Sequence, residues 1–600
     1  MKFIRCRPWM LGLALILGAG PAGVAQNPTA SNAVPAATFH AETHQVVLDV
    51  VIVDHGGHFV PGLKPADFTI LEDGKPQKVV GFAVHQASAA PPSPAPKYKL
   101  PPNQYTNYQI ADPQRPITVV LMDVLNTQVQ DQAYTRKQMI EFLKALPPGQ
   151  RVALFALGTR LRMIQGFTGD SDTLVAAAKT LLRKTSPLMT SEQERQDSEI
   201  LVSNLAANAG PGGGVSIPLE EAIHVALLSE QNYQQTDRME FTLSALQSLA
   251  RALSAYPGRK NLLWLSTEFP IRFGTNFVPT NNASQQAQAG LDNNDTRVRN
   301  LKVQSPPIKE TAALLTASQI AVYPIDVRGT ISPGTGIDIS EQDQYGSMER
   351  IGNTRAQATA RQTTMEWDDH EAMNDIARET GGKSFYGSND IKAALSASMN
   401  EGENYYTLAY TPDNHNWDGK YRKLEVKTTQ GGAKLTYRRG YYAVANPDAI
   451  KGKAVDDQIA LLFATAMHPE APTSTMVLLK VQVLPPDATH KTVRIDYAID
   501  PQDVSFVDTP DKQKHVAIDL MAVAWNKDGK SVGESSDKID TSVSLGSYEN
   551  AMRSYIPAHQ ELEVKPGKYT LRLGVVDRNS RRIGTVDVPL TVTAEQALAR

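Results

Sequence analysis

The stretch Ile117-Thr-Val-Val-Leu-Met-Asp123 decides the fold. It is a short, uninterrupted run of apolar and β-branched residues that ends on an acidic side chain, which is typical of a parallel strand buried on both faces. A helix is predicted over 131–146, where the apolar residues fall on one face before Pro147-Pro148-Gly149, and 152–157 is a second buried strand. This alternation predicts an α/β domain with a mostly parallel, Rossmann-like sheet.

The same alternation continues to residue 400. The turn Gly158-Thr159 is so short that the next strand, 160–164, is expected to be antiparallel to 152–157 and to form one edge of the sheet. Further buried strands are predicted at 262–265, 320–323 and 383–386, and helices at 174–182, 236–254 and from 368 or 369 to 380. Two polar stretches, 275–310 and 330–365, interrupt the module and are interpreted as surface insertions.

The chain on either side of this module has a β pattern. Residues 41–85 and 403–445 each predict about three strands, too few for a sandwich alone, so we expect the two segments to pair into one Ig-like unit around the α/β domain of 117–400. Residues 86–116 are rich in proline and are predicted to be a linker, as is 446–469. Residues 470–595 are long enough for a second Ig-like β-sandwich.

The N-terminus predicts export. Basic residues precede the apolar run 9–17, and small residues follow it up to Ala25, which is the order of a secretory signal peptide over 1–25 ahead of a flexible leader over 26–40. The only cysteine, Cys6, lies inside that signal, so the mature chain offers no thiol. We expect a periplasmic, envelope or extracellular protein with no transmembrane segment after cleavage, although an uncleaved anchor is an alternative.

The charge balance also limits the partners. Sixty basic residues against 63 acidic ones give a net charge of −3, which provides no electrostatic reason for nucleic-acid binding.

Several stretches carry a family resemblance. They are Arg115-Pro-Ile-Thr-Val-Val-Leu-Met-Asp-Val-Leu-Asn-Thr127, Lys260-Asn-Leu-Leu-Trp-Leu-Ser266, Glu379-Thr-Gly-Gly382, Tyr405-Tyr-Thr-Leu-Ala-Tyr-Thr-Pro412 and Arg438-Arg-Gly-Tyr-Tyr442. With this order of elements, residues 40–445 resemble the von Willebrand factor A (VWA)-related domain proteins of acidobacterial genomes. The resemblance implies a VWA-like fold and a role in binding other molecules.

Adhesive VWA domains hold Mg²⁺ or Mn²⁺ on oxygen ligands at the carboxyl edge of the sheet, so the resemblance implies a candidate metal site here. Asp123 matches the first ligand and Thr127 the last hydroxyl of the first loop, and Thr185 is a candidate for the later threonine. The middle serine position is Leu125, which cannot bind a metal, and Ser266-Thr267-Glu268 offers no aspartate after the fourth strand. The predicted site is therefore degenerate. In the alternative interpretation, Asp123 and Asn126 only cap the following helix and fix the loop.

A second constellation is Glu366-Trp-Asp-Asp-His370. Carboxylates beside a histidine are compatible with a hydrolase, but the simpler interpretation is a helix start that Asp369 caps. We found no catalytic signature and expect no enzyme. The sequence favours an exported interaction or adhesion protein that binds a protein or glycan. The alternatives are an extracytoplasmic hydrolase that uses Asp368 and His370, and a structural component of an envelope assembly.

Overall fold

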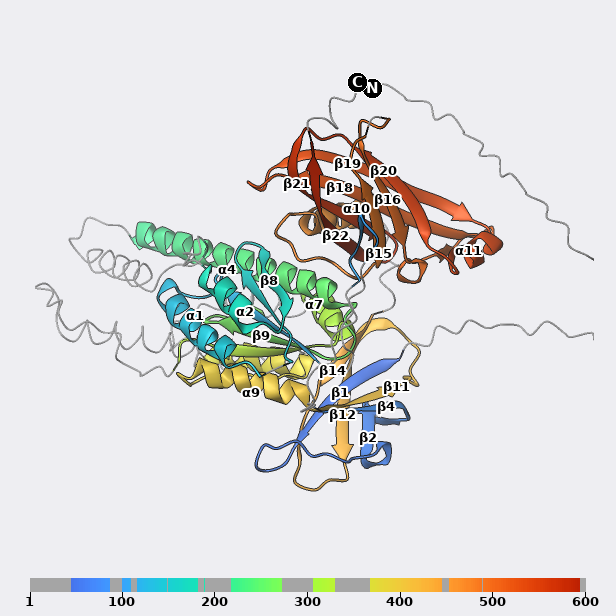
Figure 1. Ribbon diagram of the computed structural model, residues 1–600. Helices are drawn as coiled ribbons and strands as arrows, with labels where there is room; N and C mark the ends of the chain where they lie inside the picture. Colours follow the sequence, from blue (N-terminus) through green and yellow to red (C-terminus); the bar gives the residue numbers. More distant parts are fainter. Residues whose placement is uncertain are drawn as a thin grey trace, which may run out of the picture. The chain divides into compact units, whose positions relative to one another are not determined.

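The computed structural model describes a mixed α/β protein with one partly parallel sheet and four antiparallel sheets (Figure 1). The described residues are 45–86, 100–108, 116–147, 149–181, 188, 217–271, 306–329, 367–444, 453–487 and 489–593. The predicted signal peptide and leader, most of both predicted insertions and Thr185 lie outside these residues. None of the described helices is both long and apolar enough to span a bilayer.

The partly parallel sheet has the order β10-β9-β6-β7-β8. Its strands are β6 (Ile117–Asp123), β7 (Val152–Leu157), β8 (Leu161–Thr168), β9 (Lys260–Ser266) and β10 (Ile320–Asp326). The pairs β6·β7, β6·β9 and β9·β10 are parallel, and β8 runs antiparallel to β7 at the edge. Every residue of β6, β7, β9 and β10 is buried, because helices cover both faces.

One face packs against α1 (Val129–Lys144), α2 (Ser171–Lys179) and α9 (Ile391–Glu403). The other face packs against α4 (Ile217–Leu253), α7 (Pro306–Ala317) and a helix over 367–380. Trp264, which is fully buried on β9, belongs to this second core.

The β segments that precede and follow this domain share two sheets. Their orders are β13-β1-β11-β4 and β14-β12-β2-β3. The strands are β1 (Val46–Val53), β2 (Phe68–Glu72), β3 (Lys75–Gln77), β4 (Val79–His85), β11 (Tyr405–Tyr410), β12 (Asp418–Thr428), β13 (Lys434–Thr436) and β14 (Gly440–Val444). Strand β1 lies between β11 and β13, and β12 lies between β2 and β14. We call this two-sheet unit the β module.

A buried polar cluster stabilises the β module. Glu72 is 4% exposed and accepts hydrogen bonds from Tyr410 Oη at 2.6 Å, Tyr441 Oη at 2.9 Å and Arg422 Nη1 at 3.1 Å. Because β2 contributes the acid and β11, β12 and β14 contribute the donors, separating the N-terminal strands would leave a buried charge without partners.

The C-terminal β-sandwich consists of two further antiparallel sheets. One has the order β20-β16-β15-β5, and the other has the order β17-β18-β21-β22 with β19 paired to β18. The strands are β5 (Gln104–Thr106), β15 (Leu479–Leu484), β16 (Val493–Ile499), β17 (Val507–Asp508), β18 (Lys514–Trp525), β19 (Ser531–Val543), β20 (Ile556–Leu562), β21 (Gly567–Asp577) and β22 (Ile583–Val592), with a short helix α11 (Leu545–Ala551).

Two segments predicted as linkers contain regular structure. Within 86–116, β5 pairs with β15, and the buried side chain of Asn107 donates to the carbonyls of Ser474 and Val477 at 3.0 and 2.8 Å. Within 446–469, α10 (Lys453–Ala466) packs on the C-terminal sandwich through Ile459 and Phe463. The apolar spacing within 453–466 indicates a helix, but it was not recognised in the sequence. Strand β5 could not be predicted locally, because its partner β15 lies far along the chain.

Two smaller expectations also differ from the structure. The strand predicted at 383–386 is a single bridge, in which Phe385 pairs in parallel with Ile325. Helix α7 begins at Pro306, inside the stretch predicted as a polar insertion up to 310.

We predict that cutting the chain between the β segments does not release the first one. A protease site inserted within 87–99 should yield two fragments that elute together from a size-exclusion column and separate only in urea. Strands β1, β2 and β4 hydrogen-bond to β11, β12 and β13, so their exposed edges would otherwise be unpaired. A folded, freely eluting N-terminal fragment would contradict this arrangement.

Candidate functional site at the carboxyl edge of the parallel sheet

Three neighbouring parallel strands end in polar residues at one edge of the sheet. Strand β6 ends at Asp123, β9 at Ser266 and β10 at Asp326. Ser266 and Asp326 are register partners, and Leu265 pairs with Met122, so the three ends are adjacent. Ligand sites of open α/β sheets form at such carboxyl ends. This edge is therefore the candidate functional site.

Asp123 is fully buried and holds its own loop. Its Oδ1 accepts from the backbone N of Asn126, and its Oδ2 accepts from Asn126 Nδ2 and from Trp264 Nε1, each at 2.9 Å. Ser266 Oγ lies 3.4 Å from the same Oδ2. The carboxylate thus binds the β6–α1 loop to the centre of the sheet.

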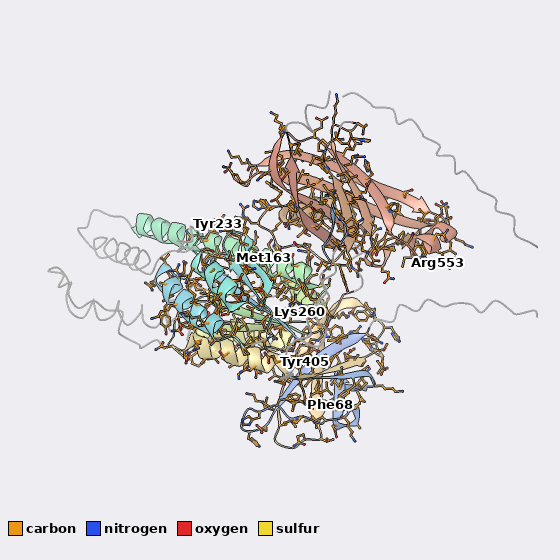
Figure 2. The ribbon with its side chains drawn as sticks, in the orientation of Figure 1. Phe68, Met163, Tyr233, Lys260, Tyr405 and Arg553 are labelled. Carbon is orange, nitrogen blue, oxygen red and sulfur yellow. The ribbon has the colours of Figure 1, made fainter. Side chains whose placement is uncertain are left out.

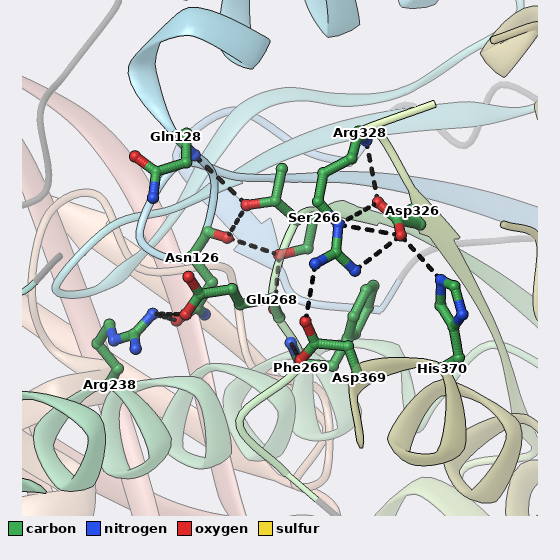
Figure 3. Close-up of polar contacts among 11 residues, drawn as sticks. Asn126, Gln128, Arg238, Ser266, Glu268, Phe269, Asp326, Arg328, Asp369 and His370 are labelled. Atoms are coloured by element: carbon green, nitrogen blue, oxygen red, sulfur yellow. Dashed lines mark hydrogen bonds and ion pairs between the residues drawn. The ribbon is translucent and has the colours of Figure 1, made fainter. Parts of the chain in front are cut away.

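The loop after β9 is tied to the loop after β6 (Figure 3). The backbone carbonyl of Asn126 accepts from Ser266 Oγ at 3.2 Å and from Thr267 Oγ1 at 2.8 Å. Arg238 of α4 donates to Glu268 Oε2 at 2.5 Å and to Asn126 Oδ1 at 3.5 Å. A guanidinium group therefore bridges the two loops, with only 11% of its side chain exposed.

A second guanidinium lies at the end of β10 (Figure 3). Arg328 binds Asp326 with two parallel hydrogen bonds, Nε to Oδ1 at 3.0 Å and Nη2 to Oδ2 at 2.8 Å. Its Nη1 lies 3.0 Å from Asp369 Oδ2, and His370 Nε2 lies 3.2 Å from Asp326 Oδ2. Asp369 Oδ1 accepts from the backbone N of Phe269 at 3.3 Å, which connects this cluster to the loop after β9. We call these four side chains the Arg328 cluster.

Burial has a large effect on the pKa values of the carboxyl groups at this edge. It raises the pKa of Asp123 to about 6, against the opposing hydrogen bonds from Asn126 and Trp264. It also raises the pKa of Asp369 to about 7, although the charge of Arg328 opposes the shift. For Asp326, burial would raise the pKa, but the hydrogen bonds from His370 and Arg328 outweigh it, so the pKa is lowered.

The predicted metal ligands do not form a cation site within the described residues. Asp123 and Thr127 are both buried at this edge, Leu125 is buried between them, and Thr185 lies outside the described part of the chain. Both Asp123 oxygens already accept N–H donors, and the positive charge of Arg238 is close enough to oppose the rise in the pKa of Asp123. Among the described residues, no three acidic, histidine or cysteine side chains are grouped to hold a metal ion. Of the predicted ligands that the structure describes, only Thr127 Oγ1 is buried without a hydrogen-bond partner, so the described donors are too few for Mg²⁺ or Mn²⁺.

The expected helix caps differ from the structure. Asp369 lies within the described part of the helix over 367–380, and its carboxylate binds Arg328 and the backbone N of Phe269. Helix α1 has Gln128 at its N-cap, without a side-chain cap, so Asp123 and Asn126 fix the loop but do not cap the helix.

Aromatic side chains are exposed beside the Arg328 cluster. Trp367 is 71% exposed and precedes His370 by three positions, which places both on one face of the helix. The ring of His370 stacks on Tyr386, with centroids 4.1 Å apart, and Tyr386 is 43% exposed. Tyr134 of α1, which is 42% exposed, donates from its hydroxyl to the carbonyl of Asn389. We call Trp367, His370 and Tyr386 the aromatic row.

Sequence reasoning missed Arg238, Asp326 and Arg328. A signal for Asp326 was present, because Ile320-Ala-Val-Tyr-Pro-Ile-Asp326 is a buried strand that ends on an acid, as β6 does. Arg328 follows two positions later. Nothing local identifies Arg238, which reaches the edge from the long helix α4.

Comparison with known proteins places the chain in no family. Neither the family models nor the curated proteins give a match. Among solved structures, 55 chains match. An aerotolerance-related membrane protein from Bacteroides fragilis has 12% identity and a TM-score of 0.21, over 48% of this chain and 99% of that chain. The PilB minor pilin from Streptococcus sanguinis has 14% identity and a TM-score of 0.22, over 48% and 60%. The pilus adhesin SpaC from Lactobacillus rhamnosus GG has 9% identity and a TM-score of 0.18, over 85% and 60%.

We predict that Arg328→Met destabilises the protein by roughly 3 kcal/mol, because buried Asp326 and half-buried Asp369 would be left without their cation. The exposed cation Lys179 of α2 provides the matched control, and Lys179→Met should change stability by less than about 0.5 kcal/mol. Equilibrium urea unfolding of both variants measures the difference. Equal unfolding midpoints for the two variants would show that Arg328 does not stabilise the Arg328 cluster.

Proposed function

We propose that this chain is an exported, non-enzymatic binding protein with a VWA-type domain, and that it binds a protein or glycan partner at the carboxyl edge without a bound cation. The motifs of residues 115–127, 260–266 and 379–382 support the VWA assignment. The strand order, with three parallel pairs and one antiparallel edge, is compatible with it.

The aromatic row is the observation that carries this proposal. Trp367 is 71% exposed, and aromatic side chains are among the residues that most often anchor an interface. The aromatic row lies beside hydrogen-bonding groups, since Asn374 Nδ2 is 3.4 Å from Tyr386 Oη. Flat rings next to polar groups suit both a protein side chain and the apolar face of a sugar ring.

The Arg328 cluster and Arg238 have a positioning role in this proposal. An adhesive VWA domain uses a cation to complete its edge, whereas here two guanidinium groups neutralise the carboxylates. The loops are then held in place before a partner arrives, which lowers the entropy cost of binding.

A hydrolase that uses Asp368 and His370 is the second candidate. One observation favours it: His370 Nε2 lies 3.2 Å from Asp326 Oδ2, the pairing that orients a general base. However, Arg328 binds both oxygens of Asp326, and Tyr386 stacks on the imidazole, so this histidine has the surroundings of a fixed structural group. We therefore favour the binding role.

Screening residues 26–600 against a printed glycan array and a peptide array tests the proposal. Trp367→Ala should reduce the signal of the bound ligands at least tenfold, because it removes the most exposed ring of the aromatic row. Tyr555→Ala is the matched control, since Tyr555 is 45% exposed but lies in the C-terminal sandwich. Unchanged binding by Trp367→Ala, or no ligand on either array, would contradict the proposal.

A further inference from the structure

A cavity lies at the opposite, amino edge of the parallel sheet, where it meets the β module. Its lining includes Asp49 of β1, Arg259, which precedes β9, Gln319, which precedes β10, and Arg438, which follows β13. The empty space is about 320 Å³, including the part open to solvent, and its interior has room for only one or a few atoms. The cavity therefore suits an ion of one or a few atoms.

Positive charge exceeds negative charge around this cavity. Arg259 and Lys260 are each 2% exposed, and Arg438 is half-buried. The charge of Asp49 acts on all three cations. Within the described residues, none of the three forms an ion pair closer than 4.0 Å. Three cations around one carboxylate leave a net charge of about +2 in a buried place, which is costly without a counter-ion.

The hydrogen bonds of these groups go mainly to neutral oxygens. Arg259 Nη2 donates to Tyr323 Oη at 3.1 Å and to the carbonyl of Gly381 at 2.5 Å, and Arg438 Nη2 donates to the carbonyl of Val47 at 2.8 Å. The Nε–H groups of both arginines are buried without a protein acceptor. Asp49 is itself bonded to Thr407 Oγ1 at 2.7 Å and lies 3.5 Å from Gln319 Nε2.

Other titratable groups lie close to Asp49, Arg259, Lys260 and Arg438. The Tyr405 ring, from β11, lies 5.8 Å from the Arg259 guanidinium, and its hydroxyl accepts from the backbone N of Arg259 at 3.3 Å (Figure 2 labels Tyr405 and Lys260). Tyr323 interacts electrostatically with Arg259, His85 with Asp49, and Glu401 with Tyr323. Burial lowers the pKa of Lys260 to about 8, so the lysine is still mostly protonated at pH 7. Even if Glu401 is counted with Asp49, the three cations Arg259, Lys260 and Arg438 leave an excess of positive charge around the cavity.

We propose that this cavity is a binding site for a small inorganic anion of the halide class, held by Arg259 and Arg438 where the β module meets the α/β domain. Guanidinium groups bind such ions through charge-assisted N–H donors, and the excess charge makes an anion a better occupant than water. The ion would link β1 and the segment after β13 to the start of β9. Its role is independent of the partner site, which lies at the other edge of the sheet.

Thermal unfolding of residues 26–600 in sodium chloride, sodium bromide and sodium gluconate tests this site, at equal ionic strength and pH 7. We expect chloride and bromide to raise the unfolding midpoint by several degrees with saturation, and gluconate, which is too large for the cavity, to leave it unchanged. Arg438→Gln should abolish the saturable shift. Arg439→Gln is the matched control, because Arg439 is the neighbouring, exposed arginine and does not line the cavity.

A crystal grown in bromide provides a second measurement that does not depend on whether a variant folds. An anomalous peak within hydrogen-bond distance of Arg259 and Arg438 supports the site. A peak without a saturable midpoint shift would identify an adventitious ion only. Water in the cavity together with equal midpoints in all three salts would also overturn the proposal.

Discussion

Buried carboxylates at the carboxyl edge of the parallel sheet are the constraint on which the rest of the structure depends. Strands β6 and β10 end on Asp123 and Asp326, both at most 2% exposed, and a carboxylate in such a place must be given donors or neutralised. Asn126 and Trp264 donate hydrogen bonds to Asp123, and Arg328 neutralises Asp326. Because these donors come from loops and from strand β9, satisfying the acids also fixes the loops after β6, β9 and β10 and, through Asp369, the helix over 367–380.

This arrangement is the physical basis of the proposed partner site at the carboxyl edge. Arg328 joins Asp326 of the sheet to Asp369 of the helix, and two residues earlier on that helix Trp367 is exposed to solvent. The Arg328 cluster forms ion pairs in the interior of this edge, and the aromatic row lies on its surface. At the amino edge positive charge is in excess, since Arg259, Lys260 and Arg438 all interact electrostatically with Asp49. The two edges therefore differ in charge, and we assign them different ligands.

Much of the fold could be predicted because its signals are local. The apolar run 117–122 identified the central strand, and the short turn at Gly158-Thr159 placed β8 antiparallel at the edge. The chemistry of the site depends on contacts between distant residues, such as Arg238 with Glu268 and Arg328 with Asp369, which no spacing reveals. For the same reason β5, whose pairing partner β15 lies more than 370 residues away in the sequence, was interpreted as part of a linker. The sequence predicted Asp123 as a metal ligand, and the structure places it at this edge with hydrogen-bond donors on both of its oxygens.

The most direct test of the account is thermal unfolding of residues 26–600 in EDTA and then in millimolar Mg²⁺, Mn²⁺ or Ca²⁺. A cation that binds only the folded state at 100 times its Kd would add about 2.7 kcal/mol, which moves the midpoint by an easily measured amount. Because Arg238 and Arg328 already neutralise the edge, the account predicts the same midpoint under all four conditions. A rise in the midpoint with one cation that Asp123→Ala abolishes would show a working metal site and contradict the central claim.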